Sequence, residues 1–140
     1  MKSISAAKSS FQFEGFRIIR SLFDRKEGKI SKSLSIGFLP KGKLYREENK
    51  FELFLGIRIE DNNKILLIEV DAVADFKLHE VGEKLLKNFL YINAPAILFP
   101  YIRAYIASLT SISGYINAIT LPTLNLTNLA NDLERNTESV

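Results

Sequence analysis

The sequence predicts an α+β fold, in which a four-stranded antiparallel sheet is followed by a long helix and a short C-terminal helix. Apolar and polar residues alternate with a period of two over most of residues 16–78, which is typical of half-buried strands. After Val81 and Gly82 the apolar residues recur at helical spacing instead. Because the strand patterns precede the helical ones, an α+β domain is favoured over alternating βα units. We expect residues 1–140 to form a single domain, since a chain of this length buries a core of its own.

The first strand pattern covers residues 16–23 and begins either there or as early as Phe11. It ends in a polar turn over residues 24–29. The sequence leaves residues 1–15 open between a flexible arm and an extra strand.

The second strand pattern covers residues 30–38. Its apolar side chains fall on one face and its serines on the other, so one face is predicted to pack on a core and the other to meet water or a partner. Pro40 and Gly42 are expected to stop this strand, because both residues interrupt regular extended structure. Residues 41–49 are accordingly predicted to form a polar connection.

The third and fourth strand patterns are the clearest in the chain. Residues 51–59 alternate without interruption, and residues 65–78 return after a turn at residues 61–64. The two asparagines of that turn tolerate the positive φ of a tight hairpin, so a long antiparallel hairpin is expected. One face of the returning strand is apolar, whereas the other carries carboxylates.

Helical spacing begins at residues 84–91, a short helix or turn that Asn93 and Pro95 are predicted to end. A long helix follows, with Pro100 in its first turn and Gly114 as its C-terminal stop. Its recurring apolar positions are Leu98, Ile102, Tyr105, Leu109 and Ile112. This helix has more apolar surface than one sheet face requires, which suggests oligomerisation through it.

The end of the chain is predicted to be a loop as far as Pro122, and then a short helix with a leucine every three or four residues. Residues 136–140 are expected to form a flexible polar tail. Residues 104–131 carry no charge, but they contain many polar residues together with glycine and proline, so no membrane insertion is expected.

The composition excludes several classes of function. The chain has no cysteine and one histidine, His79, so thiol chemistry and the usual zinc sites are excluded and no metal or cofactor is expected. No motif around His79 makes it part of a catalytic triad, and no glycine-rich loop is present to cradle a phosphate. We therefore predict that the chain is not an enzyme. Its N-terminus lacks the apolar core of a secretory signal, which predicts a cytoplasmic protein.

The charges are distributed unevenly along the chain. Residues 1–50 contain 12 Lys and Arg against 5 Asp and Glu, whereas residues 51–140 contain 7 against 11. A basic first third is compatible with an acidic partner such as nucleic acid, and also with ordinary solvated strand faces and turns. A nucleic-acid interface would use the basic residues Arg17, Arg20, Arg25, Lys26, Lys29 and Lys32. No recognised nucleic-acid-binding motif accompanies them, so this hypothesis stays secondary.

Residues 93–103 read Asn-Ala-Pro-Ala-Ile-Leu-Phe-Pro-Tyr-Ile-Arg. This segment resembles the signature of the SecB family of protein-export chaperones, whose members open their long helix with an Ile-Leu-Phe-Pro-Tyr-x-Arg run. Shorter stretches similar to the family lie at residues 65–70, Gly114, residues 121–122 and residues 125–126. The resemblance covers the chain from about Phe51 to the C-terminus.

The resemblance implies a holdase, a chaperone that keeps a client unfolded. Members of the family have sheets of four antiparallel strands backed by helices, assemble as dimers of dimers, and hold unfolded precursors in long apolar grooves without ATP. We expect the peptide-binding groove to be formed by Phe38, Leu39, Ile97, Leu98, Leu121, Leu124, Leu126 and Leu129. For each of these residues the alternative is an ordinary core position.

Four further residues are expected to position the long helix and its oligomer contacts. Phe99, Pro100 and Tyr101 belong to the signature itself, and Arg103 is expected either to pair with a carboxylate or to be solvated.

The sequence also departs from the family. Members dock the motor ATPase SecA on acidic positions of the sheet, and Leu67 and Glu69 match two of these positions. Basic residues follow Asp24 where the family offers further acid, and Leu126 stands where an aromatic residue is usual. These departures fit a specialised relative, such as the SecB-like chaperones that guard antitoxins, at least as well as a general export chaperone. The expected partners are therefore unfolded polypeptides, together with SecA or an antitoxin; a third hypothesis is a protein dedicated to one partner.

Overall fold

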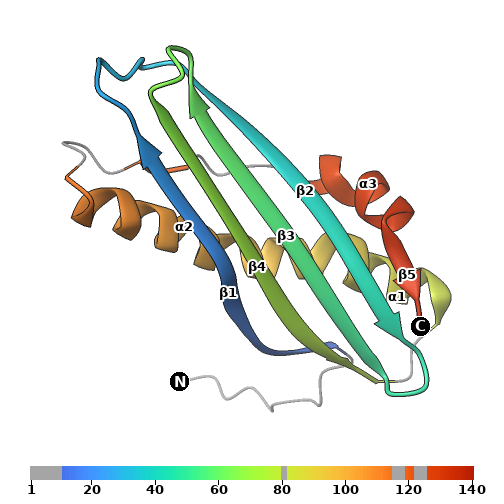
Figure 1. The fold of residues 1–140 in the computed structure, drawn as a ribbon. Helices are drawn as coiled ribbons and strands as arrows, with labels where there is room; N and C mark the ends of the chain where they lie inside the picture. Colours follow the sequence, from blue (N-terminus) through green and yellow to red (C-terminus); the bar gives the residue numbers. More distant parts are fainter. Residues whose placement is uncertain (1–10, 80–81, 115–118, 122–125) are drawn as a thin grey trace, which may run out of the picture.

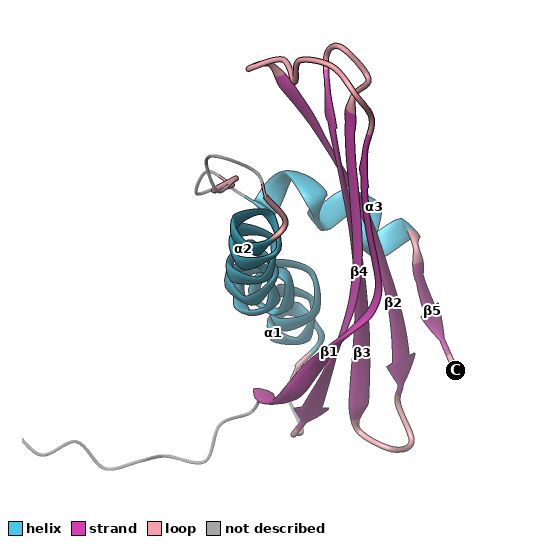
Figure 2. Cartoon of the chain, turned by 60° about the vertical axis from the view of Figure 1, so that its left-hand side comes forward, coloured by secondary structure: helices cyan, strands magenta, loops and turns pink. Residues whose placement is uncertain are grey.

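The sheet and the helices form two layers (Figure 1). The computed structural model describes residues 11–79, 82–114, 119–121 and 126–140. Over these residues the sheet has five strands in the order β1-β4-β3-β2-β5, and α1 and α2 lie against one of its faces (Figure 2). The strands are β1 Phe11–Arg25, β2 Leu34–Tyr45, β3 Lys50–Asp61, β4 Leu66–Leu78 and β5 Thr137–Ser139. The helical segments are α1 Glu83–Asn88, the π-helical turn η1 Phe89–Asn93, α2 Ala94–Ile112, the 3-10 turn η2 Leu126–Leu129 and α3 Ala130–Arg135.

The predicted fold class is confirmed. β1 to β4 pair antiparallel, and a long helix and a short C-terminal helix follow them. β1 begins at Phe11, the earlier of the two starts considered. The β3–β4 hairpin lies where the alternation predicts it. Residues 1–10 of the N-terminal segment lie outside the described residues.

The core lies between the helices and the two central strands, β3 and β4. Alternate side chains of these strands are buried on the helix face, where Phe51 and Phe76 stand opposite each other. Leu98, Ile102 and Ile106 of α2 are fully buried in the same cluster. Burying one such side chain contributes about 1.5–3 kcal/mol, so this layer supplies most of the favourable free energy of folding.

The helical layer differs from the prediction at Asn93 and Pro95, which do not end a helix. Asn93 has φ −74° and ψ −42°, and the helical path continues from α1 through η1 into α2. A proline ring collides with the carbonyl four residues earlier in a regular α-helix. The wider π-helical turn immediately before Pro95 relieves that collision, so the chain keeps its direction.

Pro100 lies inside α2 and not in its first turn, contrary to the prediction. Pro100 and Ala96 are both exposed, so the turn in which the Ala96 carbonyl loses its N–H donor lies on the solvent side of α2. The predicted stop at Gly114 is confirmed, because α2 ends at Ile112 and Gly114 takes a positive φ of 88°.

The prediction that Pro40 and Gly42 stop the second strand is wrong, because β2 continues through both. The Pro40 carbonyl accepts a hydrogen bond from Asn136 Nδ2 (3.0 Å), on the side of β2 that faces away from β3. The N and C=O of one residue in an antiparallel strand point to the same side. The missing N–H of Pro40 therefore costs the β2–β3 ladder nothing.

The predicted polar connection at residues 41–49 is shorter than expected, since only residues 46–49 form the turn. Gly42 is needed within the strand, because a Cβ there would lie 2.8 Å from the Phe51 ring and 2.7 Å from Thr137 Oγ1. The glycine thus marks a close approach of three chain segments and not the end of a strand.

The β3–β4 turn is organised by Asp61, which is almost fully buried. Its carboxylate accepts backbone hydrogen bonds from Ser31 (2.9 Å), Asn63 (3.3 Å), Ile65 (2.7 Å) and Leu66 (2.8 Å). Burial raises the pKa of this carboxyl, but the four N–H donors outweigh it, so the pKa lies below its usual value. The positive φ of the turn falls on Lys64 (59°), and not on an asparagine as the sequence predicts.

The C-terminal segment returns to the sheet (Figure 1). The predicted final helix is present as η2 and α3, and α3 packs on β2. Within residues 136–140, where a flexible tail is expected, Thr137–Ser139 form β5, which pairs in parallel with residues 42–44 of β2. Three polar residues carry no alternation long enough to predict this.

Candidate functional site

The candidate site is the edge of β2, because part of that edge is open. β5 covers β2 only at residues 42–44. The N–H and C=O groups of Leu34, Ile36 and Phe38 point away from β3, as those of Pro40 do. No described residue hydrogen-bonds to these groups. We call Leu34, Ile36 and Phe38 the open β2 edge; it offers a row of free donors and acceptors to an extended segment of another chain.

The side chains of the open β2 edge are apolar. All three are half-buried on the helix face and pack against the core. Phe38 meets α2 through Phe99, with ring centroids 6.2 Å apart. An extended segment that adds to this edge therefore meets main-chain groups and apolar surface together.

The predicted groove residues lie at different depths. Phe38, Ile97 and Leu129 are half-buried at the margin of the core. The fully or almost fully buried ones are Leu98, Leu121 and Leu126. Leu124 lies outside the described residues.

The side chains of Leu39 and Phe38 point to opposite faces of the sheet, because neighbouring strand residues alternate, although both residues border the same hollow. Leu39 is 48% exposed on the outer face of the sheet, the face without α1 and α2. It lines a shallow hollow of about 300 Å³ there, together with Gly56, Arg58 and Glu69.

The outer face carries acid from β3 and β4 and arginine from β1. Arg20 pairs with Glu69 (3.0 Å), and Arg17 pairs with Asp75 (2.7 Å). Leu67, the neighbour of Glu69 in the expected docking surface, is half-buried on the same face. The arginines of β1 thus neutralise part of the acidic surface.

The six basic residues considered for nucleic acid are divided between two places. Arg17 and Arg20 are engaged by carboxylates on the outer face. The other four are exposed at the end of β1 and in the β1–β2 connection: Arg25, Lys26, Lys29 and Lys32.

The signature residues of α2 have distinct surroundings. Phe99 is buried, whereas Pro100 is exposed. Tyr101 is 44% exposed, and its ring lies 4.6 Å from the Phe16 ring of β1. Arg103 is half-buried and donates from Nε to the Leu121 carbonyl, and no described carboxylate pairs with it.

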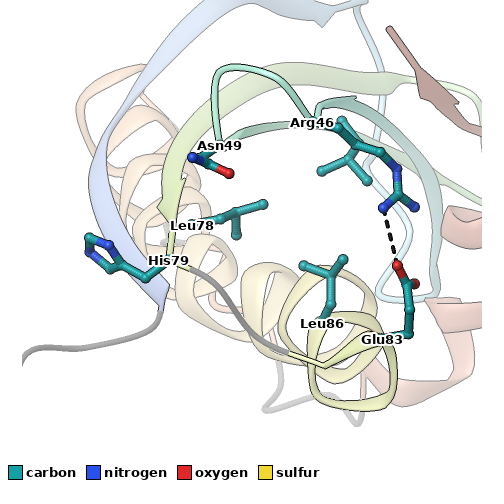
Figure 3. Close-up of a pocket in the computed structure, with 7 residues that line it drawn as sticks. Arg46, Asn49, Leu78, His79, Glu83 and Leu86 are labelled. Carbon is teal, nitrogen blue, oxygen red and sulfur yellow. Dashed lines mark hydrogen bonds and ion pairs between the residues drawn. The ribbon is translucent and has the colours of Figure 1, made fainter.

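A polar hollow lies where the β2–β3 turn faces α1 (Figure 3). It has a volume of about 330 Å³ and is lined by Leu44, Arg46, Asn49, Leu78, His79, Glu83 and Leu86. Arg46 and Glu83 form an ion pair at its rim (3.1 Å). His79 is half-exposed, and its Nε2 is buried without a hydrogen-bond partner among the described residues. Among the described residues that line the hollow, none is a serine, threonine or cysteine.

The described part of the chain contains no group of three or more acidic or histidine side chains placed to hold a metal ion. None of its helices combines the length and the apolar character needed to cross a membrane.

Comparison with known proteins identifies the family. The family described as preprotein translocase subunit SecB matches residues 29–135, which is more than half of the chain. The chain belongs to the SecB family. The match extends from the β1–β2 connection through α3, and so includes the open β2 edge. It confirms the resemblance that the segment at residues 93–103 indicates.

Curated relatives in the family are protein-export proteins SecB. The relative from Ruegeria sp. (strain TM1040) is 27% identical over 107 residues, which cover 73% of this chain and 62% of the relative. The one from Jannaschia sp. (strain CCS1) is 31% identical over 86 residues, covering 56% and 47%. The one from Orientia tsutsugamushi (strain Boryong) is 32% identical over 108 residues, covering 74% and 65%. The chain thus spans about half to two thirds of the length of these relatives.

A solved structure supports the fold. It is the Mycobacterium tuberculosis Rv1957 SecB-like chaperone in complex with a ChAD peptide from the Rv1956 HigA1 antitoxin. The TM-score is 0.69 at 19% sequence identity, and the match covers 82% of this chain and 88% of that one.

Sequence reasoning missed the full length of the β2 edge and the strand that partly covers it. Leu44 stands in phase with Ile36 and Phe38, which is the signal that the strand continues beyond Pro40. No sequence pattern predicts β5, because its pairing depends on where the chain lies after the end of α3.

Proposed function

We propose that this chain is an ATP-independent holdase that binds unfolded or nascent polypeptide as an extended segment along the open β2 edge. The observation that carries the proposal is the coincidence of unpaired main-chain groups and half-buried apolar side chains at Leu34, Ile36 and Phe38. Membership of the SecB family supports it, because relatives in that family are named as protein-export proteins.

Both kinds of contact tolerate variation in client sequence. Main-chain hydrogen bonds to a strand edge do not depend on the side chains of the added segment. Apolar contact contributes roughly 25 cal/mol for each Å² removed from water, or about 1.5–3 kcal/mol for a fully buried leucine-sized side chain. An unfolded client loses conformational freedom on binding, so several contacts in a row are needed to hold it. Neither kind of contact requires nucleotide hydrolysis.

The groove residues keep different roles in this proposal. Phe38, Ile97 and Leu129 stand at the margin of the core, where an added segment meets them. Leu98 and Leu121 support that surface from beneath, because they are buried.

We propose that the client is a dedicated or specialised polypeptide, and not one of the precursors that SecA exports. The SecB-like chaperone Rv1957 was solved with a peptide from an antitoxin. On the outer face of the present chain, Arg20 pairs with Glu69, one of the two residues expected to dock a motor. A partner that recognises acid therefore meets a partly neutralised surface. The expected place of action is the cytoplasm, where such clients are still unfolded.

We further propose a homo-oligomer, a dimer of dimers, that assembles through β1 and α2. β1 is an edge strand of the sheet. Phe16 on β1, and Tyr101 and Ile112 on α2, are 38%, 44% and 82% exposed. Large apolar side chains exposed on neighbouring elements are typical of an interface. Analytical ultracentrifugation checks the proposal, and a monomer at micromolar concentration would contradict it.

The holdase proposal is tested by fluorescence anisotropy of a labelled, permanently unfolded polypeptide in the absence of nucleotide. We expect saturable binding that changes little between about 50 and 200 mM salt, because hydrophobic contact is not screened; nucleic-acid binding falls steeply over this range. A folded protein of similar length carrying the same label is the control and is expected not to bind. Failure to bind the unfolded form would refute the proposal.

Competition between unrelated unfolded proteins then separates a general from a dedicated holdase. A general holdase is displaced by each of them at similar concentrations, whereas a dedicated one is displaced by few.

A further inference from the structure

β5 and the open β2 edge lie on the same side of β2, with Pro40 between them, whose carbonyl accepts a hydrogen bond from Asn136 Nδ2. β5 pairs in parallel with β2 through Gly42 and Thr137, Lys43 and Glu138, and Leu44 and Ser139. The open β2 edge precedes these residues on the same strand. Over residues 34–44, the chain's own C-terminal segment therefore fills only the last part of an edge that accepts an extended segment.

β5 is held by its ladder with β2, by two main-chain hydrogen bonds at its ends, and by side-chain hydrogen bonds from Asn136 Nδ2 to the Pro40 carbonyl and from Thr137 Oγ1 to the Leu133 carbonyl. The Val140 N–H donates to the Leu44 carbonyl (2.9 Å), and the Gly42 N–H donates to the Asn136 carbonyl (3.3 Å). Glu138 and Val140 are exposed, Val140 by 63%. The bonds of the ladder and of its two ends are main-chain bonds, which any extended segment can make.

The side chains of β5 add little apolar contact. Thr137 and Ser139 stand opposite Gly42 and Leu44, and so share the helix face with the apolar side chains of the open β2 edge. Both are polar. A segment with apolar residues at these positions would gain hydrophobic contact that β5 does not have.

We propose that β5 is a built-in competitor for the β2 edge, which an extended client segment displaces when it binds; this inference rests on the proposed function. The client makes the bonds that β5 makes at residues 42–44 and adds those of the open β2 edge. Because β5 is tethered, it competes at an effective concentration in the millimolar range. Short segments that reach only one part of the edge do not overcome it. β5 therefore selects long extended segments with alternating apolar residues.

A reversible disulfide tests the proposal, since the chain has no cysteine of its own. The substitutions Lys43→Cys and Glu138→Cys put thiols on a paired position of β2 and β5. Neighbouring strands bring Cα atoms within the range that a disulfide bridges. The double substitution Lys43→Ser and Glu138→Ser is the matched control, because it removes the same charges and cannot form the bond.

The expected result is a difference between the two redox states of the cysteine variant. The reduced form binds the unfolded polypeptide as the control does, whereas the oxidised form binds it on the order of tenfold more weakly, because the client loses the hydrogen bonds at residues 42–44. Urea unfolding of both forms verifies that each is folded. Equal affinity of the oxidised and reduced forms would overturn the competitor role and leave the holdase proposal standing. Absence of binding by every form, the unsubstituted chain included, would overturn both.

Amide hydrogen exchange measures the displacement of β5 directly in the unsubstituted chain. On saturation with unfolded polypeptide, the Val140 amide is expected to exchange faster, because its bond to the Leu44 carbonyl is lost. The amides of Leu34, Ile36 and Phe38 are expected to exchange more slowly, because the client covers them. Unchanged exchange at Val140 in the fully bound chain would contradict the displacement.

Discussion

The substitution Leu98→Ala tests whether Leu98, one of the residues predicted to form the groove, belongs to the hydrophobic core or to the binding surface. Leu98 is fully buried between α2 and the sheet, so its truncation leaves a cavity and is expected to cost about 2–5 kcal/mol of unfolding free energy. Leu39 is the matched control, because it is 48% exposed. Full burial of a leucine contributes about 1.5–3 kcal/mol, so Leu39→Ala is expected to cost less than about 1.5 kcal/mol.

Urea unfolding measures both variants, followed by far-UV circular dichroism or by the fluorescence of the five tyrosines, since the chain has no tryptophan. With a denaturant slope of about 1–3 kcal/mol per M, Leu98→Ala lowers the midpoint by roughly 1–2 M. Leu39→Ala shifts it by a fraction of that. A loss for Leu98→Ala no larger than for Leu39→Ala would refute the assignment of Leu98 to the core.

Three other predictions follow from the structure. Phe38→Ala is expected to weaken unfolded-polypeptide binding about fivefold to tenfold in the anisotropy assay, through lost apolar contact; unchanged affinity would place the client elsewhere. The four N–H donors hold the pKa of Asp61 below its usual value in the folded protein. These hydrogen bonds therefore stabilise the fold fully above the pKa of an unfolded-state aspartate, about 4, and their contribution to the unfolding free energy is lost as the pH falls below it. Asp61→Asn is expected to flatten this loss in urea midpoints measured across acidic pH, and an identical pH profile would exclude the role. Gly42→Ala places a Cβ 2.7 Å from Thr137 Oγ1 and 2.8 Å from the Phe51 ring, so it is expected to loosen β5 and cost about 1–3 kcal/mol, seen as faster exchange at Val140.

The four long strands were predictable because each packs apolar side chains against the core, which are partly buried in β1 and fully buried in β3 and β4. In β3 and β4 the buried positions alternate along most of the strand, and that alternation is visible in the sequence. α2 was predictable for the corresponding reason, since its buried residues recur at helical spacing. Local pattern is sufficient where burial itself is periodic.

The effects of the prolines were not predictable from local pattern. Pro40 does not stop β2 because its missing N–H faces the edge, and the edge is a property of the whole sheet. Pro95 does not end the helix because a π-helical turn precedes it. The free-energy cost of a proline depends on which acceptor an N–H at that position would have bonded, and the local sequence does not identify that acceptor.

The candidate site was only partly predictable. The sequence pointed to Phe38 but grouped Leu39 with it, because the predicted second strand ended at Phe38. In the continuous strand the two side chains face opposite ways. The open β2 edge and β5 are consequences of strand order and of the path after α3. The pairing of Arg20 with Glu69 likewise depends on β1 lying next to β4.

The most direct test of the holdase account is aggregation of a chemically unfolded, slow-folding protein, followed by light scattering after dilution with and without this chain and without ATP. The account predicts suppression at a near-stoichiometric ratio. Unchanged scattering in the presence of the folded, oligomeric chain would contradict it.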